Sequence, residues 1–298
     1  MVAFLRKLLV RGLSTSRDVE RWTGLPYLGA IPRAQARASR LNPSAAVVEY
    51  DDPALAASFK NLHATFLREC PGARVVALSS AVPKDGKTTC SVALARTSAL
   101  RGHRTVLLDF DLRRRSASAE LRKPAAVGLL EVMSGRARLD EGLYFDGFTP
   151  LYVLPASDDL ELVRKAVVKD VFSSPMMTEL VTVLRRRFDY IFIDTPPLLA
   201  VADTRHIAPH VDAFLFVTRW GRTPKDSVAA AVDLLKSTRT PLAGVVLTQA
   251  PPQAPPRAAE KTGVVARGVE CDPLSDAHGT LRRRSSLDTA DSRRLAGG

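Results

Sequence analysis

Residues 81–88 read Ala-Val-Pro-Lys-Asp-Gly-Lys-Thr, a spacing of residue types that can bind phosphate. Lys87 can reach the terminal phosphates of a nucleotide, the Thr88 hydroxyl can ligate Mg²⁺, and backbone N–H groups of the loop can point at phosphate oxygens. Ala81 replaces the first glycine of the usual G-x-x-x-x-G-K-[ST] pattern, so the sequence predicts a variant phosphate-binding loop. The residues expected to contact the nucleotide there are Lys84, Asp85, Gly86, Lys87, Thr88 and Thr89.

Three aspartates, Asp109, Asp111 and Asp194, each follow an apolar run elsewhere in the chain. Any one of them alone could be a helix cap or a turn residue. Because the carboxyl ends of parallel strands meet at one edge of a sheet, all three are expected to converge on the loop that holds Lys87. Carboxylates beside phosphates need a cation between them, which predicts Mg²⁺ held by Thr88, Asp111 and Asp194.

These motifs require a sheet that brings them together. The apolar runs show almost no polar alternation, which is typical of strands buried on both faces. Helix-forming stretches alternate with them, so the expected fold class is α/β: a mostly parallel, doubly wound sheet flanked by helices on both faces, as in P-loop NTPases. Strands are expected near 75–79, 105–109, 151–155, 190–194, 213–218 and 243–247, and helices near 53–68, 88–101, 175–187 and 223–237.

The motif set resembles that of a known family. The phosphate loop, Leu-Leu-Asp-Phe-Asp-Leu-Arg from residue 107 and Ile-Phe-Ile-Asp-Thr-Pro-Pro from residue 191 are similar to the nucleotide-binding motifs of bacterial tyrosine kinases of capsule and exopolysaccharide export. That family is a branch of the MinD/ParA-like P-loop group. The resemblance covers roughly residues 17–250, and residues 18–32 resemble the family's juxtamembrane segment. It implies an ATP- and Mg²⁺-dependent protein-tyrosine kinase that controls capsule or exopolysaccharide synthesis and export.

The resemblance also implies roles for individual residues. Asp111 and Asp194 would hold the metal. Asp109 would orient or deprotonate the incoming phenol, while Lys87 and Arg113 would offset charge on the transferring phosphoryl group. The expected catalytic residues are therefore Lys87, Asp109, Asp111, Arg113 and Asp194.

The chain departs from the family in several places. The family's ring-forming helix motif is replaced by Ala57, Lys60 and His63, so a homo-oligomer is expected to be weaker or absent, and His63 is expected on a helix surface. Gln249 stands where related ATPases commonly offer Asn to the adenine, and it is expected to bind the nucleotide. The family's tail carries a tyrosine cluster for autophosphorylation, whereas no tyrosine follows Tyr190 here. The five tyrosines are Tyr27, Tyr50, Tyr144, Tyr152 and Tyr190, the last two expected in buried strands.

Two other classes of function stay open. In one, the chain is a MinD/ParA-like ATPase switch or a degenerate kinase subunit that regulates assembly at the membrane without phosphorylating tyrosine. The absent tail tyrosines favour this reading, whereas Val82 disfavours it, because MinD/ParA relatives place a second loop lysine at that position. In the other, the chain is an interaction module of the export machinery, which the intact nucleotide motifs disfavour.

The amino-acid composition indicates the domain organisation and the compartment. The 298 residues are 46% hydrophobic with a net charge of +12, which suits one large globular domain with tails. The expected regions are a basic juxtamembrane-like segment at 1–50, an ATP-binding kinase domain at 51–250 and a disordered tail at 251–298. Three scattered cysteines favour a reducing compartment, and the sequence has no apolar run long enough for a transmembrane helix.

The same features predict partners and location. We expect a cytoplasmic protein peripheral to the inner face of the plasma membrane. Its expected partners are a transmembrane polysaccharide co-polymerase that acts as activator, and protein substrates that carry tyrosine. Few aromatic residues and no nucleic-acid-binding motif argue against a nucleic-acid partner.

Overall fold

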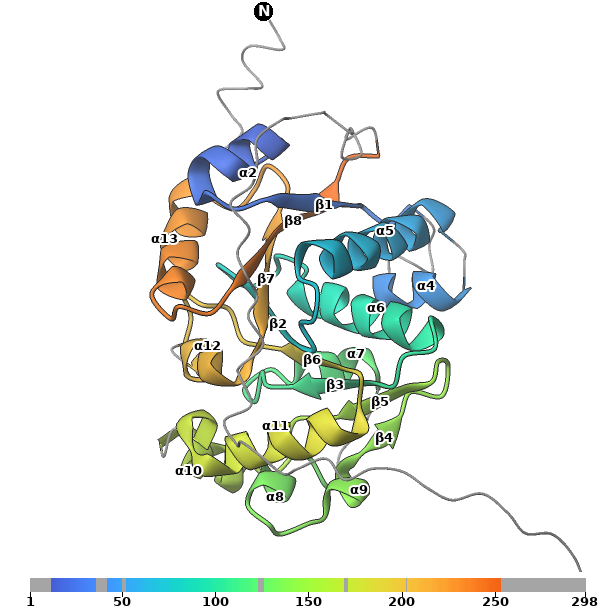
Figure 1. Cartoon of the computed structure of the whole chain (residues 1–298), viewed down its shortest axis with the longest axis vertical. Coiled ribbons are helices and arrows are strands. Elements are labelled where there is room, and N and C mark those ends of the chain that lie inside the picture. The colour runs from blue at the N-terminus through green and yellow to red at the C-terminus, as the bar shows by residue number, and fades with distance from the viewer. Residues whose placement is uncertain are drawn as a thin grey trace, which may run out of the picture.

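An eight-stranded sheet forms the centre of the protein, in the order β1-β8-β7-β2-β6-β3-β5-β4 (Figure 1). The structure is a computed structural model that describes residues 12–35, 42–49, 52–122, 126–168, 171–201 and 203–252. Every neighbouring pair of strands is parallel except β4 with β5, so the predicted α/β fold class is confirmed. The strands are β1 (Tyr27–Pro32), β2 (Val75–Ser80), β3 (Thr105–Asp109), β4 (Tyr144–Phe145), β5 (Leu151–Leu154), β6 (Tyr190–Asp194), β7 (Ala213–Arg219) and β8 (Leu242–Ala250).

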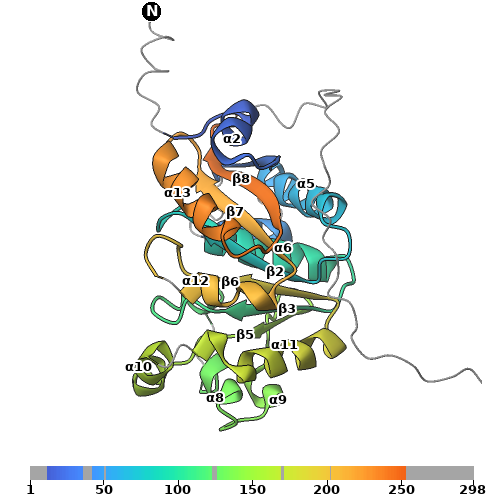
Figure 2. The same ribbon diagram turned by 60° about the vertical axis from the view of Figure 1, so that its left-hand side comes forward.

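Helices cover both faces of the sheet (Figure 2). Alternate residues of a strand point to opposite faces, so Ile191 and Ile193 pack among α8, α11 and α13, whereas Phe192 packs among α5, α6 and α7. Burial on both faces explains why the central strands are continuously apolar. The helices are α2 (Ser16–Thr23), α4 (Ala46–Glu49), α5 (Pro53–Glu69), α6 (Lys87–Leu100), α7 (Ser116–Glu120), α8 (Leu129–Met133), α9 (Leu139–Gly142), α10 (Leu160–Val168), α11 (Pro175–Arg187), α12 (Asp203–His206) and α13 (Lys225–Lys236).

The folded unit extends upstream of residue 51. Thr15 and Asp18 form a capping box at the start of α2, and Gly24 ends that helix in the left-handed region with φ 66°. The helix packs on α13, and β1 adds a parallel edge strand to β8. Part of the predicted N-terminal segment, 1–50, therefore belongs to the sheet, whereas the predicted tail lies outside the described residues except for 251 and 252.

Two expectations about single residues are wrong. His63 is 0% exposed rather than on the helix surface, and neither ring nitrogen has a hydrogen-bond partner. Its ring lies 6.3 Å from that of His103 and 6.4 Å from that of Tyr190. Tyr152 is 41% exposed, because the strand outside it, β4, has only two residues and covers little of β5. Tyr50 lies outside the described residues.

The central strands end at one edge of the sheet and bring the predicted motifs together. Strands β3 and β6 run in register, so Asp109 is paired directly with Asp194. Strand β2 lies between β6 and β7 and leads into the loop that precedes α6. Within the part of the chain that the structure describes, no helix combines the length and apolar character that a membrane crossing needs.

Candidate active site

The predicted phosphate loop connects β2 to α6, with Lys87 as the first residue of the helix. Two residues of the loop adopt positive φ, Lys84 at 70° and Gly86 at 88°. A Cβ at Gly86 would lie 3.1 Å from the Thr248 hydroxyl oxygen, so this position combines a left-handed backbone with a close approach that favours glycine. The backbone of the loop therefore curves at the N-terminus of α6. Such a curve can form a concavity in which backbone N–H groups bind an anion.

Asp85 fastens the loop to the neighbouring strands. Its carboxylate accepts a hydrogen bond of 2.5 Å from the Thr223 hydroxyl and one of 3.4 Å from the Val82 N–H. Its carbonyl oxygen accepts a bond of 2.5 Å from the Thr248 hydroxyl. Burial raises the pKa of Asp85 to about 6, although the bond from Thr223 acts in the opposite direction. The side chain predicted to contact the nucleotide thus holds the loop against the segment after β7, and the backbone carbonyl of Asp85 holds it against β8.

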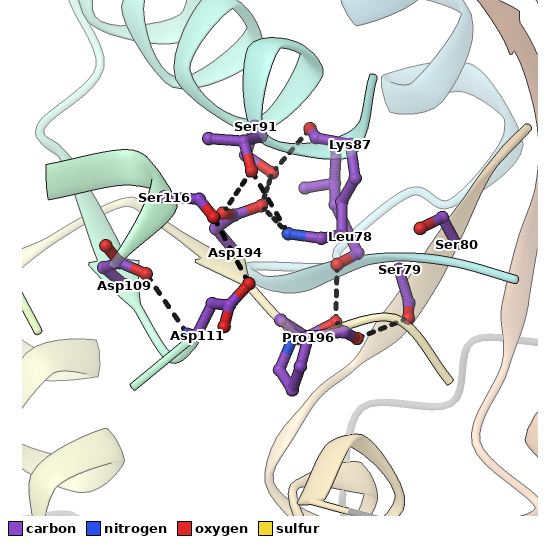
Figure 3. Close-up of polar contacts among 12 residues, drawn as sticks. Leu78, Ser79, Ser80, Lys87, Ser91, Asp109, Asp111, Ser116, Asp194 and Pro196 are labelled. Atoms are coloured by element: carbon purple, nitrogen blue, oxygen red, sulfur yellow. Dashed lines mark hydrogen bonds and ion pairs between the residues drawn. The ribbon is translucent and has the colours of Figure 1, made fainter. Parts of the chain in front are cut away.

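Lys87 is paired with Asp194 in the interior of the site (Figure 3). Lys87 Nζ lies 2.6 Å from Asp194 Oδ1, and the two side chains are 6% and 0% exposed. The Thr88 hydroxyl donates to Asp194 Oδ2 at 2.9 Å, and the Ser91 hydroxyl lies 2.8 Å from Oδ1. One buried carboxylate is therefore shared by a lysine and two hydroxyl groups in the interior of the site.

Asp109 is turned away from the open part of the site. It is 0% exposed and accepts hydrogen bonds from the Ser118 N–H at 2.8 Å, the Ser118 hydroxyl at 2.7 Å and the Asp111 N–H at 3.2 Å. Burial, and then the neighbouring charge of Asp194, raise the pKa of Asp109 well above that of an ordinary carboxyl. Its contacts fix the start of α7 and the backbone of Asp111.

An open cleft of about 410 Å³ lies over the loop, and Asp111 lines it. The Asp111 carboxylate accepts bonds from the Arg114 N–H at 3.1 Å and the Ser116 hydroxyl at 3.3 Å. The cleft therefore brings together eight of the eleven predicted positions and leaves out Asp109, Asp194 beneath its floor, and Arg113. The lining residues are Ser80, Pro83, Lys84, Asp85, Gly86, Lys87, Thr88, Thr89, Asp111, Arg114, Ser116, Pro197, Arg219 and Gln249.

Arg113 is exposed but does not line the cleft, whereas its neighbour Arg114 does. Sequence reasoning also missed Ser91 and Arg219. Ser91 stands four residues after Lys87, one helical turn along α6, and that spacing could have indicated its contact with the same carboxylate. Arg219 carried no local signal, because only the pairing of β7 with β2 and β8 brings it to the cleft.

A second, more apolar pocket of about 260 Å³ adjoins the cleft and shares Gly86, Thr89 and Gln249 with it. Gln249 has positive φ, 52°, at the end of β8 and contributes to both cavities. The remaining lining residues are Ile31, Pro32, Arg33, Ala34, Pro43, Leu55, Phe59, Cys90 and Thr248. The size and lining suit a flat, largely apolar group next to a phosphate-binding cleft.

Similarity to known proteins agrees with this geometry. A family model described as an AAA domain matches residues 73–213. Tyrosine-protein kinase CpsD of Streptococcus pneumoniae serotype 4 is 33% identical over 177 residues, which are 59% of this chain and 76% of CpsD. The succinoglycan biosynthesis transport protein ExoP of Rhizobium meliloti is 34% identical over 179 residues, again 59% of this chain, but the chain spans only 22% of ExoP.

Among solved structures, the kinase domain of Escherichia coli tyrosine kinase ETK matches with a TM-score of 0.70 at 21% identity, over 82% of this chain and 97% of that domain. At that identity the match shows the fold, which is a nucleotide-binding P-loop fold with the loop between β2 and α6. The 33% identity with CpsD extends over 76% of that relative. The chain therefore belongs to the family of bacterial tyrosine-protein kinases of capsule and exopolysaccharide biosynthesis.

Proposed function

We propose that this chain is an ATP-dependent protein-tyrosine kinase that controls capsule or exopolysaccharide synthesis and export. The observation that carries the proposal is the meeting of Lys87, Thr88, Asp111 and Asp194 at one edge of a parallel sheet, around an open cleft. Phosphoryl transfer depends mainly on positioning and on charge stabilisation, and these groups supply both.

ATP would lie with its phosphates along the loop from Lys84 to Thr89. The apolar pocket beside the loop is the proposed adenine site, with Gln249 at its boundary. In the nucleotide-bound state Lys87 would turn from Asp194 to the terminal phosphates. The carboxylate it leaves is deeply buried and needs a replacement cation, because an unpaired buried charge is costly.

The residues around Asp194 fit Mg²⁺ as that replacement. The Thr88 hydroxyl and the carboxylates of Asp111 and Asp194 are hard oxygen donors, the type that Mg²⁺ prefers, and Thr88 already contacts Asp194 at 2.9 Å. Bound Mg²⁺ would neutralise charge on the phosphate oxygens. Ser91 would hold Asp194 in place while Lys87 moves.

The acceptor tyrosine would enter the cleft on the side of Asp111. Asp109 was predicted to take the phenol proton, but its carboxylate is buried and engaged with Ser118. Asp111 is also buried and hydrogen-bonded, but it lines the cleft and Asp109 does not, so we assign that role to Asp111 and a positioning role to Asp109. In the proposed step the phenol oxygen bonds to the γ-phosphorus, the bond from that phosphorus to ADP breaks, and Asp111 receives the phenol proton.

An Asp111→Asn variant tests this assignment. We expect phosphate transfer to a tyrosine peptide to fall by at least about 100-fold, because the amide cannot accept the proton. ADP affinity measured by calorimetry without Mg²⁺ should stay within about threefold, since Asn keeps the size of the side chain. Asp233→Asn is the matched control, because Asp233 is 73% exposed on α13 and outside the cleft. Equal loss of transfer in both variants, or none in Asp111→Asn, would contradict the role.

We further propose a transmembrane polysaccharide co-polymerase as the activator and location at the inner face of the membrane. The resemblance of residues 18–32 to a juxtamembrane segment supports this, and α2 and β1 hold that segment against the domain. Co-purification of the full chain with membrane proteins of its own cells, followed by mass spectrometry, is the test. Recovery of the chain without any membrane protein of polysaccharide export would count against it.

A further inference from the structure

Strands β1 and β7 are separated only by β8 (Figure 1), and the ends of these two strands lead to three arginines whose charges act on one another. Arg33 follows β1 and is fixed by a hydrogen bond of 2.8 Å from its N–H to the Ala250 carbonyl of β8. Arg219 ends β7 opposite Thr248 of β8. Since one strand separates them, their backbones are about 10 Å apart. Arg222 follows in the next turn, where its N–H bonds the Arg219 carbonyl at 3.3 Å. Arg33, Arg219 and Arg222 are called the arginine rim.

The arginine rim carries positive charge that the nearby Asp85 offsets only in part. No ion pair joins any of its three members to another described residue. Arg33 and Arg222 are exposed, and Arg219 is half-buried in the cleft wall. Burial lowers the pKa of Arg219, the charges of Arg222 and Arg33 lower it further, and the charge of Asp85 acts in the opposite direction, so Arg219 is repelled by both of the other arginines.

Other cations extend this field around the cleft. Lys84 and Arg114 also line the cleft and are exposed, and neither is in an ion pair with a described residue. The phosphate loop already has Lys84 and Lys87 for the nucleotide, and Arg222 adds positive charge outside both cavities, whereas Arg219 lines the cleft and Arg33 lines the apolar pocket. A cleft lined by one sign of charge concentrates partners of the opposite sign.

We propose that the arginine rim binds acidic residues that flank the acceptor tyrosine, so that the kinase selects tyrosines in acidic segments of its protein substrates. The inference rests on the kinase function proposed above. Guanidinium groups bind carboxylates through paired hydrogen bonds, which gives orientation as well as attraction. The chain's own residues 251–298 contain no tyrosine and include the run Leu-Arg-Arg-Arg, so this part of the chain offers no acidic acceptor segment.

Three peptides of equal length with one central tyrosine test the proposal, with glutamate, serine or lysine in the flanking positions. For the full chain we expect kcat/KM for the glutamate peptide to exceed that for the serine peptide by about tenfold, and the lysine peptide to be the poorest substrate. Raising NaCl from about 50 to about 300 mM should reduce the preference, because the arginine rim faces solvent.

Arg222→Glu places a carboxylate among the remaining arginines and should reduce the preference for the glutamate peptide to about twofold or less. MgADP affinity should not change, because Arg222 lines neither the cleft nor the apolar pocket. Arg138→Glu is the matched control, an exposed arginine outside both cavities, and it should keep the full preference. Arg222→Gln should fall between the wild type and Arg222→Glu.

The outcomes separate the inference from the proposed function. Equal rates on the three peptides would overturn the inference and leave the kinase function intact. No transfer to any peptide, with nucleotide bound, would overturn the kinase function and the inference with it. If Arg222→Glu abolished binding to phosphatidylserine vesicles but kept the peptide preference, the arginine rim would be a lipid-headgroup site, and the inference would be wrong.

Discussion

Replacing Lys87 with methionine should destabilise the nucleotide-free protein strongly, in addition to any effect on activity. Lys87 Nζ lies 2.6 Å from Asp194 Oδ1, and both side chains are almost completely buried. Methionine keeps most of the volume but removes the charge, so Asp194 would stay in the interior with only the hydroxyls of Thr88 and Ser91 as partners. Asp109, paired with Asp194 in the sheet register, adds repulsion that no cation then offsets.

The size of the effect follows from this burial. Removing one partner of a buried ion pair costs about 3–5 kcal/mol, and we expect Lys87→Met to lie in that range. Asp194→Asn should cost about 1–2 kcal/mol, because it relieves the repulsion with Asp109 and the long Lys87 side chain can extend into the cleft that it lines. The double variant should resemble Asp194→Asn, which gives a coupling energy equal in size to the cost of Lys87→Met, about 3–5 kcal/mol.

Urea unfolding at neutral pH without nucleotide or Mg²⁺ measures all four proteins of this cycle. Equal m-values would show that the variants differ in stability and not in the extent of unfolding. The free energy of unfolding of Lys87→Met could instead lie within about 0.5 kcal/mol of the wild-type value, as is usual when an exposed residue is replaced. In that case Lys87 would not be paired with Asp194 in solution. The account of how Lys87 moves on nucleotide binding would then be wrong.

Three further predictions concern other parts of the chain. The pKa of the buried His63 is lowered to about 4, chiefly by burial. The neutral His63 ring therefore makes its full contribution to the free energy of unfolding above pH 6.5, and this contribution is lost as the pH falls toward 4. Wild type should therefore lose about 2 kcal/mol more than His63→Leu between pH 7 and pH 5 in urea titrations, and parallel curves would contradict this. Gly86→Ala should cost about 1–2 kcal/mol and weaken ADP binding in calorimetry, because the residue has φ 88° and Thr248 lies against it; unchanged affinity would contradict the loop geometry. Removing residues 253–298 should leave the melting temperature and ADP affinity unchanged, since the last strand ends at Ala250; a lower melting temperature would show that the tail packs on the domain.

Six of the eight strands of the sheet, all except β1 and β4, could be predicted because they are buried on both faces, which removes the polar alternation from their sequence. Strands β1 and β4 gave no such signal. Strand β1 contains Gly29 and ends at Pro32, both unfavourable in a central strand, and β4 has two residues at the sheet edge. The N-terminal limit of the domain was therefore predicted too late in the chain.

Site positions were predictable where a motif places them, as with Lys87, Thr88 and Asp194. The direction in which each side chain points could not be predicted from the motifs. The motif with Asp109 and Asp111 does not say which carboxylate faces the cleft, because this depends on Ser118, which bonds Asp109 from the next helix. Some charged residues of the site, such as Arg219, lie on strands that are distant in the sequence. They can be assigned to the site only when the order of the strands in the sheet is known.

The central claim is that the chain transfers phosphate from ATP to tyrosine, and wild-type protein with radiolabelled ATP and Mg²⁺ tests it most directly. The γ-phosphate label should appear on a tyrosine peptide, as phosphotyrosine by mass spectrometry, and not on the matched peptide with phenylalanine in its place. Omitting Mg²⁺ should abolish the transfer. Release of all label as inorganic phosphate, with neither peptide modified and no phosphotyrosine on the chain, would contradict the account and identify a nucleotide-driven switch.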